Sequence, residues 1–306
     1  MTTILFVKTS SLGDVVHNCP AVSDAARALP GVAIDWIVEE PFAGIAAMHG
    51  AVRRVIPVAV RRWRSGLWKP EVWAEIGAWR REVRRSRYDA VVDTQSLLKS
   101  AFVSALARGR RHGMDWASAR EPLAAAFYQV RHAVPRALHA VERNRRLTAA
   151  ALGFSLQASI DYGIRIPAAE QSSYVVLLTM TSRADKLWPE ERWVELGRGL
   201  RATAILPWGS EAERARAHRI AQAIGGTTLP EPLALDGLAR LFAAARGVVG
   251  LDTGLTHLAA ALGVPTVGIY CGSDPVLTGL YGASHAKNLG ARGRPPAAGE
   301  VLQALA

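Results

Sequence analysis

Short apolar runs and longer amphipathic stretches alternate along the chain, which is the pattern of strands alternating with helices. The clearest example is RGVVGLDTGLTHLAAALGVPTVGIYCG, residues 246–272. It predicts a strand over 248–251, a polar turn, a helix over 255–262 and a second strand over 266–270. Neither strand alternates apolar with polar residues, as expected for a parallel sheet that is covered on both faces. The stretch therefore predicts a compact βαβ unit.

The first half of the chain shows the same alternation. An apolar strand over Thr3–Val7 is followed by a polar loop and by a helix that begins near Asp14 and runs towards Leu29. Apolar residues at helical spacing predict an amphipathic, basic helix over residues 70–87. We further expect VRRVIPVAVRRWR to be a strand ending in a basic cluster, RGRRHGMDW to be a basic turn, and residues 115–150 to be helical with breaks at Pro122 and Pro135.

The alternation of strands and helices starts again after residues 153–173, a stretch with Gly, Pro, Gln and Ser but no sustained periodicity. A chain of 306 residues also exceeds the size at which one core keeps growing. We therefore predict an α/β protein with two Rossmann-like, doubly wound domains that face each other across a cleft. The predicted domains are residues 1–160 and 161–306.

Composition narrows the class of protein. Half of the residues are hydrophobic and 21% are charged, and no apolar run reaches the ~18 residues that span a bilayer. The first strand leads into Lys8 without a basic leader or a cleavage site, so we expect a soluble, cytoplasmic protein. The two cysteines, Cys19 and Cys271, match no zinc spacing.

Positive charge is concentrated in the first half. The formal net charge is +11, and residues 1–150 hold 23 Lys and Arg against 13 Asp and Glu, whereas residues 151–306 hold 14 against 13. This asymmetry favours an anionic partner for the first half. The partner would be a nucleic acid, a membrane surface or an acidic substrate. Composition does not choose among the three.

Polar residues follow three strands of the second half. Because the carboxyl ends of parallel strands meet at one edge of a sheet, these residues should line one crevice. A lysine, hydroxyls and the N–H groups of a helix start suit a diphosphate, and a carboxylate suits ribose hydroxyls. The residues are Thr181, Ser182 and Lys186 after one strand, Glu213 after the next, and Asp252, Thr253, Gly254 and His257 in the βαβ unit.

Local roles remain open for several of these residues. Lys186 also fits a solvated lysine at a helix start, Asp252 and Thr253 fit helix caps, and His257 fits a polar residue of the first helical turn. The chain contains neither a Walker A loop nor a GxGxxG segment, and no DxD or His-rich spacing for a metal. Amides and cationic side chains would therefore meet the charge of a phosphate.

The first half offers Asp14, Lys8 and the basic clusters as candidates. At the start of the first helix Asp14 fits a helix cap or a general base, and Lys8, at a strand end, can face an anionic ligand. Arginine clusters at 61–64, 80–87 and 108–111 lie among tryptophans. That mixture fits nucleic-acid stacking, core packing with a wet edge, or a solvated face.

A family resemblance runs from residue 4 to about residue 275. The segments that carry it are KTSSLGDVVH, DWIVEE, VIPVAVRRWR, YDAVVDTQSLLKSA, HGMDWASAREPLA, HAVERNRRL, DKLWPEERW, LPWG and DTGLTHLAAAL. In them the chain resembles the heptosyltransferase I family of lipopolysaccharide core biosynthesis, within the ADP-heptose glycosyltransferases of GT-B fold. The segments TSSLGD and HGMDW favour the enzyme that adds the first heptose over heptosyltransferase II.

The resemblance implies a metal-independent, inverting transfer of L-glycero-D-manno-heptose from ADP-heptose to a Kdo sugar of Kdo-lipid A, without a cofactor. It implies that Asp14 is the catalytic base. Ser182 stands where the family usually has a second threonine, and Leu233 stands beside the nucleotide where a methionine is expected. The implied donor site comprises Thr181, Ser182, Lys186, Glu213, Leu233, Asp252, Thr253, Gly254 and His257.

The basic first half then becomes the expected acceptor face, because Kdo-lipid A carries phosphates and carboxylates. Arg61, Arg62, Arg64 and Arg120 are the candidate acceptor residues. A membrane-embedded acceptor implies peripheral docking at the cytoplasmic face of the inner membrane, and we expect no nucleic-acid partner. The alternatives are a heptosyltransferase that acts later in the core and, in a different class, a nucleic-acid-binding regulator that uses the basic half.

Overall fold

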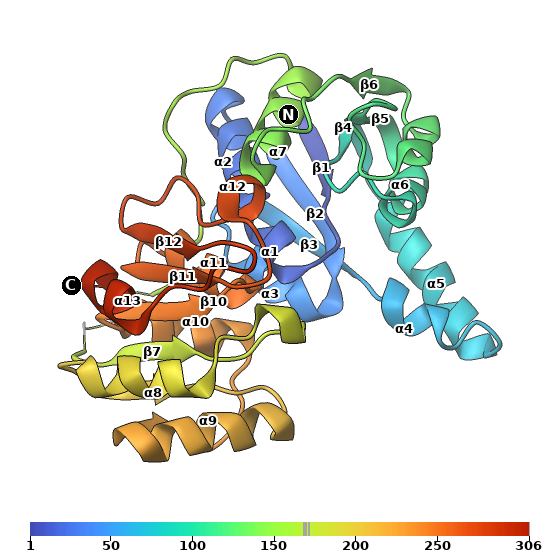
Figure 1. Cartoon of the computed structure of the whole chain (residues 1–306). Coiled ribbons are helices and arrows are strands. Elements are labelled where there is room, and N and C mark those ends of the chain that lie inside the picture. The colour runs from blue at the N-terminus through green and yellow to red at the C-terminus, as the bar shows by residue number, and fades with distance from the viewer. Residues whose placement is uncertain (168–169, 171, 306) are drawn as a thin grey trace. The chain divides into compact units, whose positions relative to one another are not determined.

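A computed structural model describes residues 1–167, 170 and 172–305 of the chain. The chain forms two compact units, Met1–Arg165 and Ile166–Ala306 (Figure 1). Each unit is built on a parallel β-sheet with helices on both faces. The predicted α/β fold of two Rossmann-like domains is confirmed.

The first unit has the strand order of a dinucleotide-binding domain. Its strands run in the order β3-β2-β1-β4-β5-β6, and each neighbouring pair is parallel. The order reverses between β1 and β4, and open α/β sheets bind their ligands at the carboxyl ends of strands beside such a switch point. The strands are β1 (Thr3–Val7), β2 (Ala33–Glu39), β3 (Val52–Val58), β4 (Arg87–Asp93), β5 (Arg108–Met114) and β6 (Val130–His132).

Apolar residues cover both faces of this sheet. Residues 4–7 of β1 are fully buried, which explains the unbroken apolar run at the start of the chain. On one face Val72 and Val83 pack with Leu5 and Val91 in a single cluster. The helices are α1 (Leu12–Val16), α2 (Cys19–Ala28), α3 (Ala43–Ala47), α4 (Val60–Arg64), α5 (Pro70–Val83), α6 (Leu98–Ala105) and α7 (Ala140–Leu152), with 3-10 turns η1 (Glu40–Phe42) and η2 (Pro122–Phe127).

Two helices replace the single helix that the sequence predicted after β1. Helix α1 ends at Val16 and α2 begins at Cys19. Pro20 lies in the first turn of α2 and has no N–H to donate to the carbonyl of Val16. A continuous helix is therefore interrupted, and Asp14 belongs to a short helix of its own.

Of three further predictions for the first unit, one was wrong and two were right only in part. The predicted strand over VRRVIPVAVRRWR ends at Val58, and its basic cluster forms helix α4. The predicted basic turn is strand β5, and residues 115–150 include strand β6. In β5 Arg108 and Arg110 are exposed. Because these charged residues replace the apolar residues expected in a strand, the sequence of β5 resembles a polar turn.

The second unit repeats the strand order of the first. Its strands run β12-β11-β10-β7-β8-β9, again with parallel neighbours, and the switch point lies between β10 and β7. The predicted βαβ unit is confirmed as β10 (Gly247–Leu251), α11 (Gly254–Ala261) and β11 (Thr266–Tyr270). The other elements are β7 (Val175–Leu178), β8 (Ala204–Leu206), β9 (Thr227–Thr228), β12 (Ala286–Gly290), η3 (Ala184–Lys186), α8 (Glu190–Gly199), α9 (Glu211–Ile224), α10 (Leu235–Ala244), α12 (Pro275–Thr278) and α13 (Ala298–Leu305).

A tryptophan pair anchors the core of the second unit. Trp188 and Trp193 are fully buried, and their rings meet edge to face with centroids 5.0 Å apart. Such a pair contributes about 0.5–1.5 kcal/mol beyond the area that it buries. The indole N–H of Trp188 donates to the carbonyl of Pro296 over 3.1 Å. Because Trp188 follows Lys186 closely in the chain, this packing fixes the segment that carries the lysine.

The last residues of the first unit are tied to its body by a clasp. The N–H of Gly50 donates to the carbonyl of Gly163 over 2.9 Å, and the N–H of Arg165 donates to the carbonyl of Met48 over 2.7 Å. Gly163 has φ +62°, and a Cβ there would lie 2.5 Å from Nε2 of His49. Glycine is therefore required at this position, for its backbone conformation and for space.

His49 acts within this clasp as a structural bridge. Its Nδ1 accepts from the N–H of Ala51 over 3.2 Å, so Nε2 carries the proton. Nε2 lies 3.1 Å from the carbonyl of Cys19 and 3.1 Å from Oγ of Ser23. With its proton on Nε2, the imidazole cannot serve as a base towards Ser23.

Candidate active site

Loops after four neighbouring strands bring polar side chains to one edge of the second sheet. Strands β11, β10, β7 and β8 are adjacent in that order and parallel, so the loops at their carboxyl ends lie side by side. Lys186 lies in η3 after β7, and Asp252 directly follows β10. The two side chains therefore flank the switch point of this sheet.

Asp252 is the centre of this arrangement. Its Oδ2 accepts from Nζ of Lys186 and from Oγ of Ser273, each over 2.6 Å, and its Oδ1 lies 3.6 Å from Nε2 of His257. Desolvation alone would raise the pKa of Asp252, but contacts with His257, Lys186 and Ser273 outweigh it and hold that pKa well below its usual range. An ionised carboxylate thus fixes an ammonium group at the switch point.

The start of α11 presents N–H groups next to Asp252. Thr253 is the N-cap residue, in extended conformation. Oγ1 of Thr256 donates to the carbonyl of Leu251 over 2.6 Å, and Gly250 makes room for it because a Cβ there would lie 2.3 Å from Oγ1. The first N–H groups of a helix lack partners within the helix and carry partial positive charge, so this end suits a phosphate.

Glu213 lies at the start of α9, after β8. Its Oε2 accepts from the N–H of Gly209 over 2.7 Å, and its own N–H is 3.3 Å from Oγ of Ser210, the N-cap residue. Both contacts lie at the N-terminus of α9, one with the N-cap residue and one with the residue before it. The carboxylate is therefore held in place at the same edge as Asp252, with one oxygen engaged by the backbone.

The structure places every predicted donor residue at the carboxyl edge of the second sheet, but it joins only some of them. Lys186 and His257 are brought to Asp252. Thr181, Ser182, Glu213 and Leu233 make no hydrogen bond to Asp252 within the described residues; Thr181 is half-buried, Ser182 is exposed, and Leu233 is 40% exposed just before α10.

The sequence analysis missed Ser273, which follows β11. Besides its bond to Asp252, the loop of Ser273 packs on the turn that carries Lys186, since a Cβ on Gly272 would lie 2.4 Å from the carbonyl oxygen of Asp185. The available signal was a Gly-Ser-Asp segment at the end of the second strand of the βαβ unit. Any polar residue at that position reaches the edge where Asp252 lies.

A buried lysine occupies the switch point of the first unit. Lys8, at the end of β1, is 4% exposed, and its Nζ donates to the carbonyl of Thr94 over 2.9 Å and to Oδ1 of Asn144 over 3.3 Å. Burial lowers the pKa of Lys8 to about 8, although the charge of Asp14 opposes this shift. The ammonium group is therefore held among neutral oxygens.

Asp14 stands in the first turn of α1, but the N-cap residue is Ser11. Oδ2 of Asp14 accepts from the N–H of Ser11 over 3.0 Å, and Nη1 of Arg120 lies 3.4 Å from both carboxylate oxygens. The side chain is 23% exposed, so the carboxylate is open to a ligand. Asp14 thus accepts a hydrogen bond at the helix start, and its carboxylate remains accessible for a role as general base.

Of the three predicted arginines on α4, Arg62 is already paired. It is 3.0 Å from Glu40 and 2.8 Å from Glu75. Arg61 and Arg64 are exposed and form no salt bridge within the described part of the chain. Helix α4 follows β3, so these residues also lie at the carboxyl edge of their sheet.

Lys99 is a second residue that the sequence analysis missed at this edge. Its Nζ donates to Oγ of Ser10 over 2.6 Å, in the loop between β1 and α1. Burial lowers the pKa of Lys99, with the charge of Glu39 opposing the shift. The segments that follow β1, β4 and β5 therefore place Lys8, Lys99 of α6 and Arg120 around Asp14.

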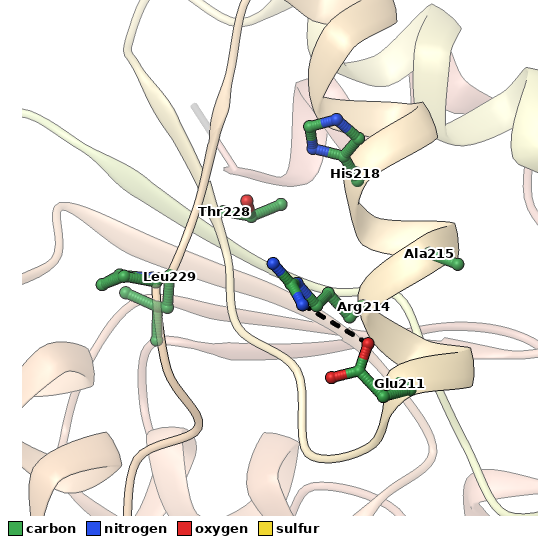
Figure 2. Close-up of a pocket in the computed structure, with 7 residues that line it drawn as sticks. Glu211, Arg214, Ala215, His218, Thr228 and Leu229 are labelled. Carbon is green, nitrogen blue, oxygen red and sulfur yellow. Dashed lines mark hydrogen bonds and ion pairs between the residues drawn. The ribbon is translucent and has the colours of Figure 1, made fainter.

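A separate pocket of about 400 Å³ lies between α9 and the end of β9 (Figure 2). Beside it, the guanidinium of Arg214 stacks 5.3 Å over the ring of Trp208, whose N–H donates to the carbonyl of Leu229 over 2.7 Å. None of the predicted donor residues lines this pocket. Its walls are Glu211, Arg214, Ala215, His218, Thr228, Leu229 and Pro230.

No group of three or more His, Cys, Asp or Glu side chains is placed to hold a metal ion in residues 1–167, 170 and 172–305. The cationic side chains at the two edges that are not fully buried include Lys186 in the second unit and Lys99 and Arg120 in the first.

Comparisons with known proteins give a consistent result. Residues 76–301 match the family described as Glycosyltransferase family 9 (heptosyltransferase). Lipopolysaccharide heptosyltransferase 1 of Escherichia coli (strain K12) is 47% identical over 290 residues, which is 91% of each chain. E. coli heptosyltransferase WaaC with ADP superposes with a TM-score of 0.92 and 44% identity, covering 99% of this chain and 98% of that chain. E. coli WaaC with ADP-2-deoxy-2-fluoro heptose superposes with a TM-score of 0.89 and 43% identity over the same shares.

Proposed function

The chain belongs to glycosyltransferase family 9, the heptosyltransferases, and we propose that it transfers L-glycero-D-manno-heptose from ADP-heptose to a Kdo residue of Kdo-lipid A. The single observation that carries this proposal is the 47% identity to lipopolysaccharide heptosyltransferase 1 over 91% of both chains. The two superposed WaaC structures are those with ADP and with ADP-2-deoxy-2-fluoro heptose, which supports ADP-heptose as the donor.

The donor is assigned to the carboxyl edge of the second unit. Lys186 and the start of α11 provide cationic and N–H groups for the diphosphate, and His257 adds a ring N–H. Glu213 provides a carboxylate for ribose hydroxyls, and Leu233 an apolar side chain beside the base. Asp252 holds Lys186 and Ser273 at this edge through a hydrogen bond with each, and Thr253 and Gly254 follow it at the start of α11.

The reaction assigned to this site is a displacement with inversion at the anomeric carbon. A Kdo hydroxyl oxygen attacks C1 of the heptose, the bond from C1 to the diphosphate oxygen breaks, and ADP leaves. The hydroxyl proton passes to Asp14, whose carboxylate is open and already held by the N–H of Ser11. Lys186 stabilises the negative charge that grows on the leaving diphosphate.

The acceptor is assigned to the carboxyl edge of the first unit. Arg61 and Arg64 are exposed and form no salt bridge in the described chain, and Arg61 lies 5.5 Å over the ring of Phe42, so both charges are available to phosphates or carboxylates. Arg120 is free to turn from Asp14 to an acceptor carboxylate, since 3.4 Å marks a loose pair. Arg62 has a smaller role than the sequence implied, because Glu40 and Glu75 already compensate its charge.

The cell location proposed is the cytoplasmic face of the inner membrane, where the enzyme docks peripherally. Within the described residues, no helix has the length and apolar character to cross a bilayer. A peripheral enzyme reaches a membrane-embedded acceptor through its basic surface, and the excess of positive charge in residues 1–150 supports this mode.

One assay tests the proposal: ADP release from ADP-heptose by the purified protein, with Kdo-lipid A, with the heptosylated acceptor and with nucleic acid in parallel. Turnover with Kdo-lipid A and none with the acceptor that already carries the first heptose is the expected result. The reverse preference would assign the chain to a later heptosyltransferase of the core. Salt-sensitive binding of nucleic acid without any ADP release would support the regulator instead.

A further inference from the structure

The turn that joins α4 and α5 exposes large apolar side chains. Helices α4 and α5 extend away from the sheet of the first unit and meet at this turn (Figure 1). Trp68 is 75% exposed, Trp73 is 59% exposed and Leu67 is 45% exposed. We name these three residues, together with Lys69, the α4–α5 tip. An apolar group of this size on a monomer surface commonly marks an interaction site.

The tryptophans of this segment divide into two pairs with different environments. Trp63 and Trp79 are buried, and their rings meet edge to face with centroids 5.8 Å apart. Trp73, in contrast, turns outward, and its N–H donates to the carbonyl of Leu67 over 2.7 Å. The core beneath the tip is thus complete without Trp68 and Trp73, so packing does not explain the exposed pair.

Positive charge predominates along the segment that carries the α4–α5 tip, where Arg61, Arg64 and Lys69 are exposed near the tip beside one exposed carboxylate, Glu71. Residues 60–87 hold nine Lys and Arg against three Asp and Glu. Glu75 is engaged by Arg62, and Glu82 by Arg54 and Arg85. The remaining cations are exposed, including Lys69 within the tip. This field favours an anionic surface and opposes a second copy of the same tip, because a two-fold contact would place like charges together.

Tryptophan and leucine among lysines and arginines is the composition of a segment that lies in the interface of a bilayer. The indole rings enter the headgroup layer, and the cations attract anionic lipids. We propose that the α4–α5 tip docks on an anionic phospholipid bilayer by inserting Leu67, Trp68 and Trp73. Nucleic acid would use the same charge, but it offers no apolar layer for a leucine.

This inference rests on the proposed function, which places the acceptor in the same bilayer. Helix α4 carries Arg61 and Arg64 directly before the tip. Docking of the tip therefore holds these two arginines at the level of the headgroups, where the phosphates of an embedded acceptor lie. The tip serves acceptor encounter and takes no part in the chemical step.

The direct test measures binding of the full chain to vesicles of about 30% phosphatidylglycerol and 70% phosphatidylethanolamine, by co-sedimentation. Trp68→Ala combined with Trp73→Ala should lower the partition coefficient about tenfold or more, because two large rings leave the interface. The matched control is Val276→Ala with Leu277→Ala, two residues of α12 that are 72% and 43% exposed. The control should change binding by less than about twofold.

Further measurements decide whether a bilayer, a second copy of the chain or a nucleic acid binds the α4–α5 tip. Binding should fall on pure phosphatidylcholine and when salt rises from ~0.1 to ~1 M. Equal binding by the tip variant and the wild type would overturn the proposal. The proposal would also be overturned if light scattering showed that the wild type is a dimer and the tip variant a monomer. It would be overturned as well if the tip variant lost binding to duplex nucleic acid but kept binding to vesicles. Trp68→Ser alone, at a 75% exposed position, provides a second variant in case the double variant folds poorly.

A two-substrate assay separates this inference from the proposed function. With a deacylated, soluble acceptor, the tip variant should release ADP at the wild-type rate. With Kdo-lipid A in vesicles, its KM should rise about tenfold while kcat is kept, since only encounter is impaired. If the wild type turned over neither acceptor, the proposed function would fail, and vesicle binding would still decide the role of the tip. Equal loss with both acceptors would assign the tip to folding or to catalysis.

Discussion

The two sheets have the same strand order, yet their switch points are occupied in different ways. Between β1 and β4, Lys8 is buried and bonded to neutral oxygens of Thr94 and Asn144. Between β10 and β7, Lys186 is partly exposed and bonded to the carboxylate of Asp252. The first switch point is closed by its own lysine, whereas the second keeps a lysine within reach of a ligand.

The difference is consistent with the proposal that the two units bind different substrates. Residues 1–165 hold 24 Lys and Arg against 14 Asp and Glu, while residues 166–306 hold 13 against 12. In the nearly neutral unit, one placed lysine and a helix start suffice for a compact diphosphate. In the basic unit the cations lie around the switch point, which suits the larger anionic acceptor that we propose. The two units thus share a strand order and differ in the side chains at their carboxyl edges.

Replacing Asp14 should have the largest effect on kcat. It tests whether a residue beside the first switch point is the general base. Asp14→Asn keeps the acceptor of the Ser11 N–H but cannot take a proton, so kcat should fall by about 10²–10⁴-fold. ADP-heptose affinity, measured by calorimetry, should persist. The matched control is Glu300→Gln, which alters a carboxylate that accepts a backbone N–H at the start of α13 and should leave kcat unchanged. Near wild-type turnover by a folded Asp14→Asn would leave Asp14 with its helix-start role alone.

The buried Lys8 predicts a specific pH dependence of stability. Burial lowers its folded-state pKa to about 8, below the unfolded value of 10.5. Between these pH values the unfolded chain binds more protons, so the free energy of unfolding should rise by about 3 kcal/mol from pH 8 to pH 10.5. Urea unfolding of the wild type and of Lys8→Met, at matched pH, isolates this contribution. An identical pH slope in both proteins would show that Lys8 is not desolvated.

Removing the lysine of the second switch point sharpens the contrast with the first. Lys186→Ala should weaken ADP-heptose binding by about 1–3 kcal/mol in calorimetry, the scale of a charge-assisted hydrogen bond. Arg183→Ala is the matched control, because Arg183 lies in the same segment and is paired with the exposed Asp185. Unchanged affinity in Lys186→Ala would remove Lys186 from the donor site.

The smallest effect is expected at Ser273. Ser273→Ala removes one hydrogen bond to Asp252 and should weaken donor binding by about 1 kcal/mol, roughly fivefold, with little change in kcat. Ser273→Thr keeps the hydroxyl and should restore affinity, which a loss of folding would not allow. If both variants bound the donor like the wild type, Lys186 alone would position Asp252.

The sequence predicted those helices and strands whose own residues carry a clear pattern of apolar and polar positions. The βαβ unit of the second sheet was predicted because its strands are apolar throughout and a Gly-Val-Pro turn separates its helix from β11. Strand β6, with three residues, and β9, with two, are too short for any periodicity to show. Arginines on β5 concealed a strand that is defined by its neighbours in the sheet.

The same distinction holds for the candidate sites. Asp252 and Lys186 were predicted because each follows a strand, and the position alone brings them to one edge. Ser273 was missed because its bond depends on how two loops approach each other. The pairing of Arg62 with Glu75 joins two helices, so no local pattern shows that its charge is already compensated. The roles assigned to the donor and acceptor residues remain predictions.

The clasp at His49 has a practical consequence for recombinant fragments of the first unit. A fragment that stops at residue 160 lacks Gly163 and Arg165, so the N–H of Gly50 and the carbonyl of Met48 lose their partners. Each lost bond costs about 1 kcal/mol, and the buried imidazole of His49 is opened to water. A fragment that runs through Arg165 keeps the clasp closed and is the better choice for expression and isotope labelling.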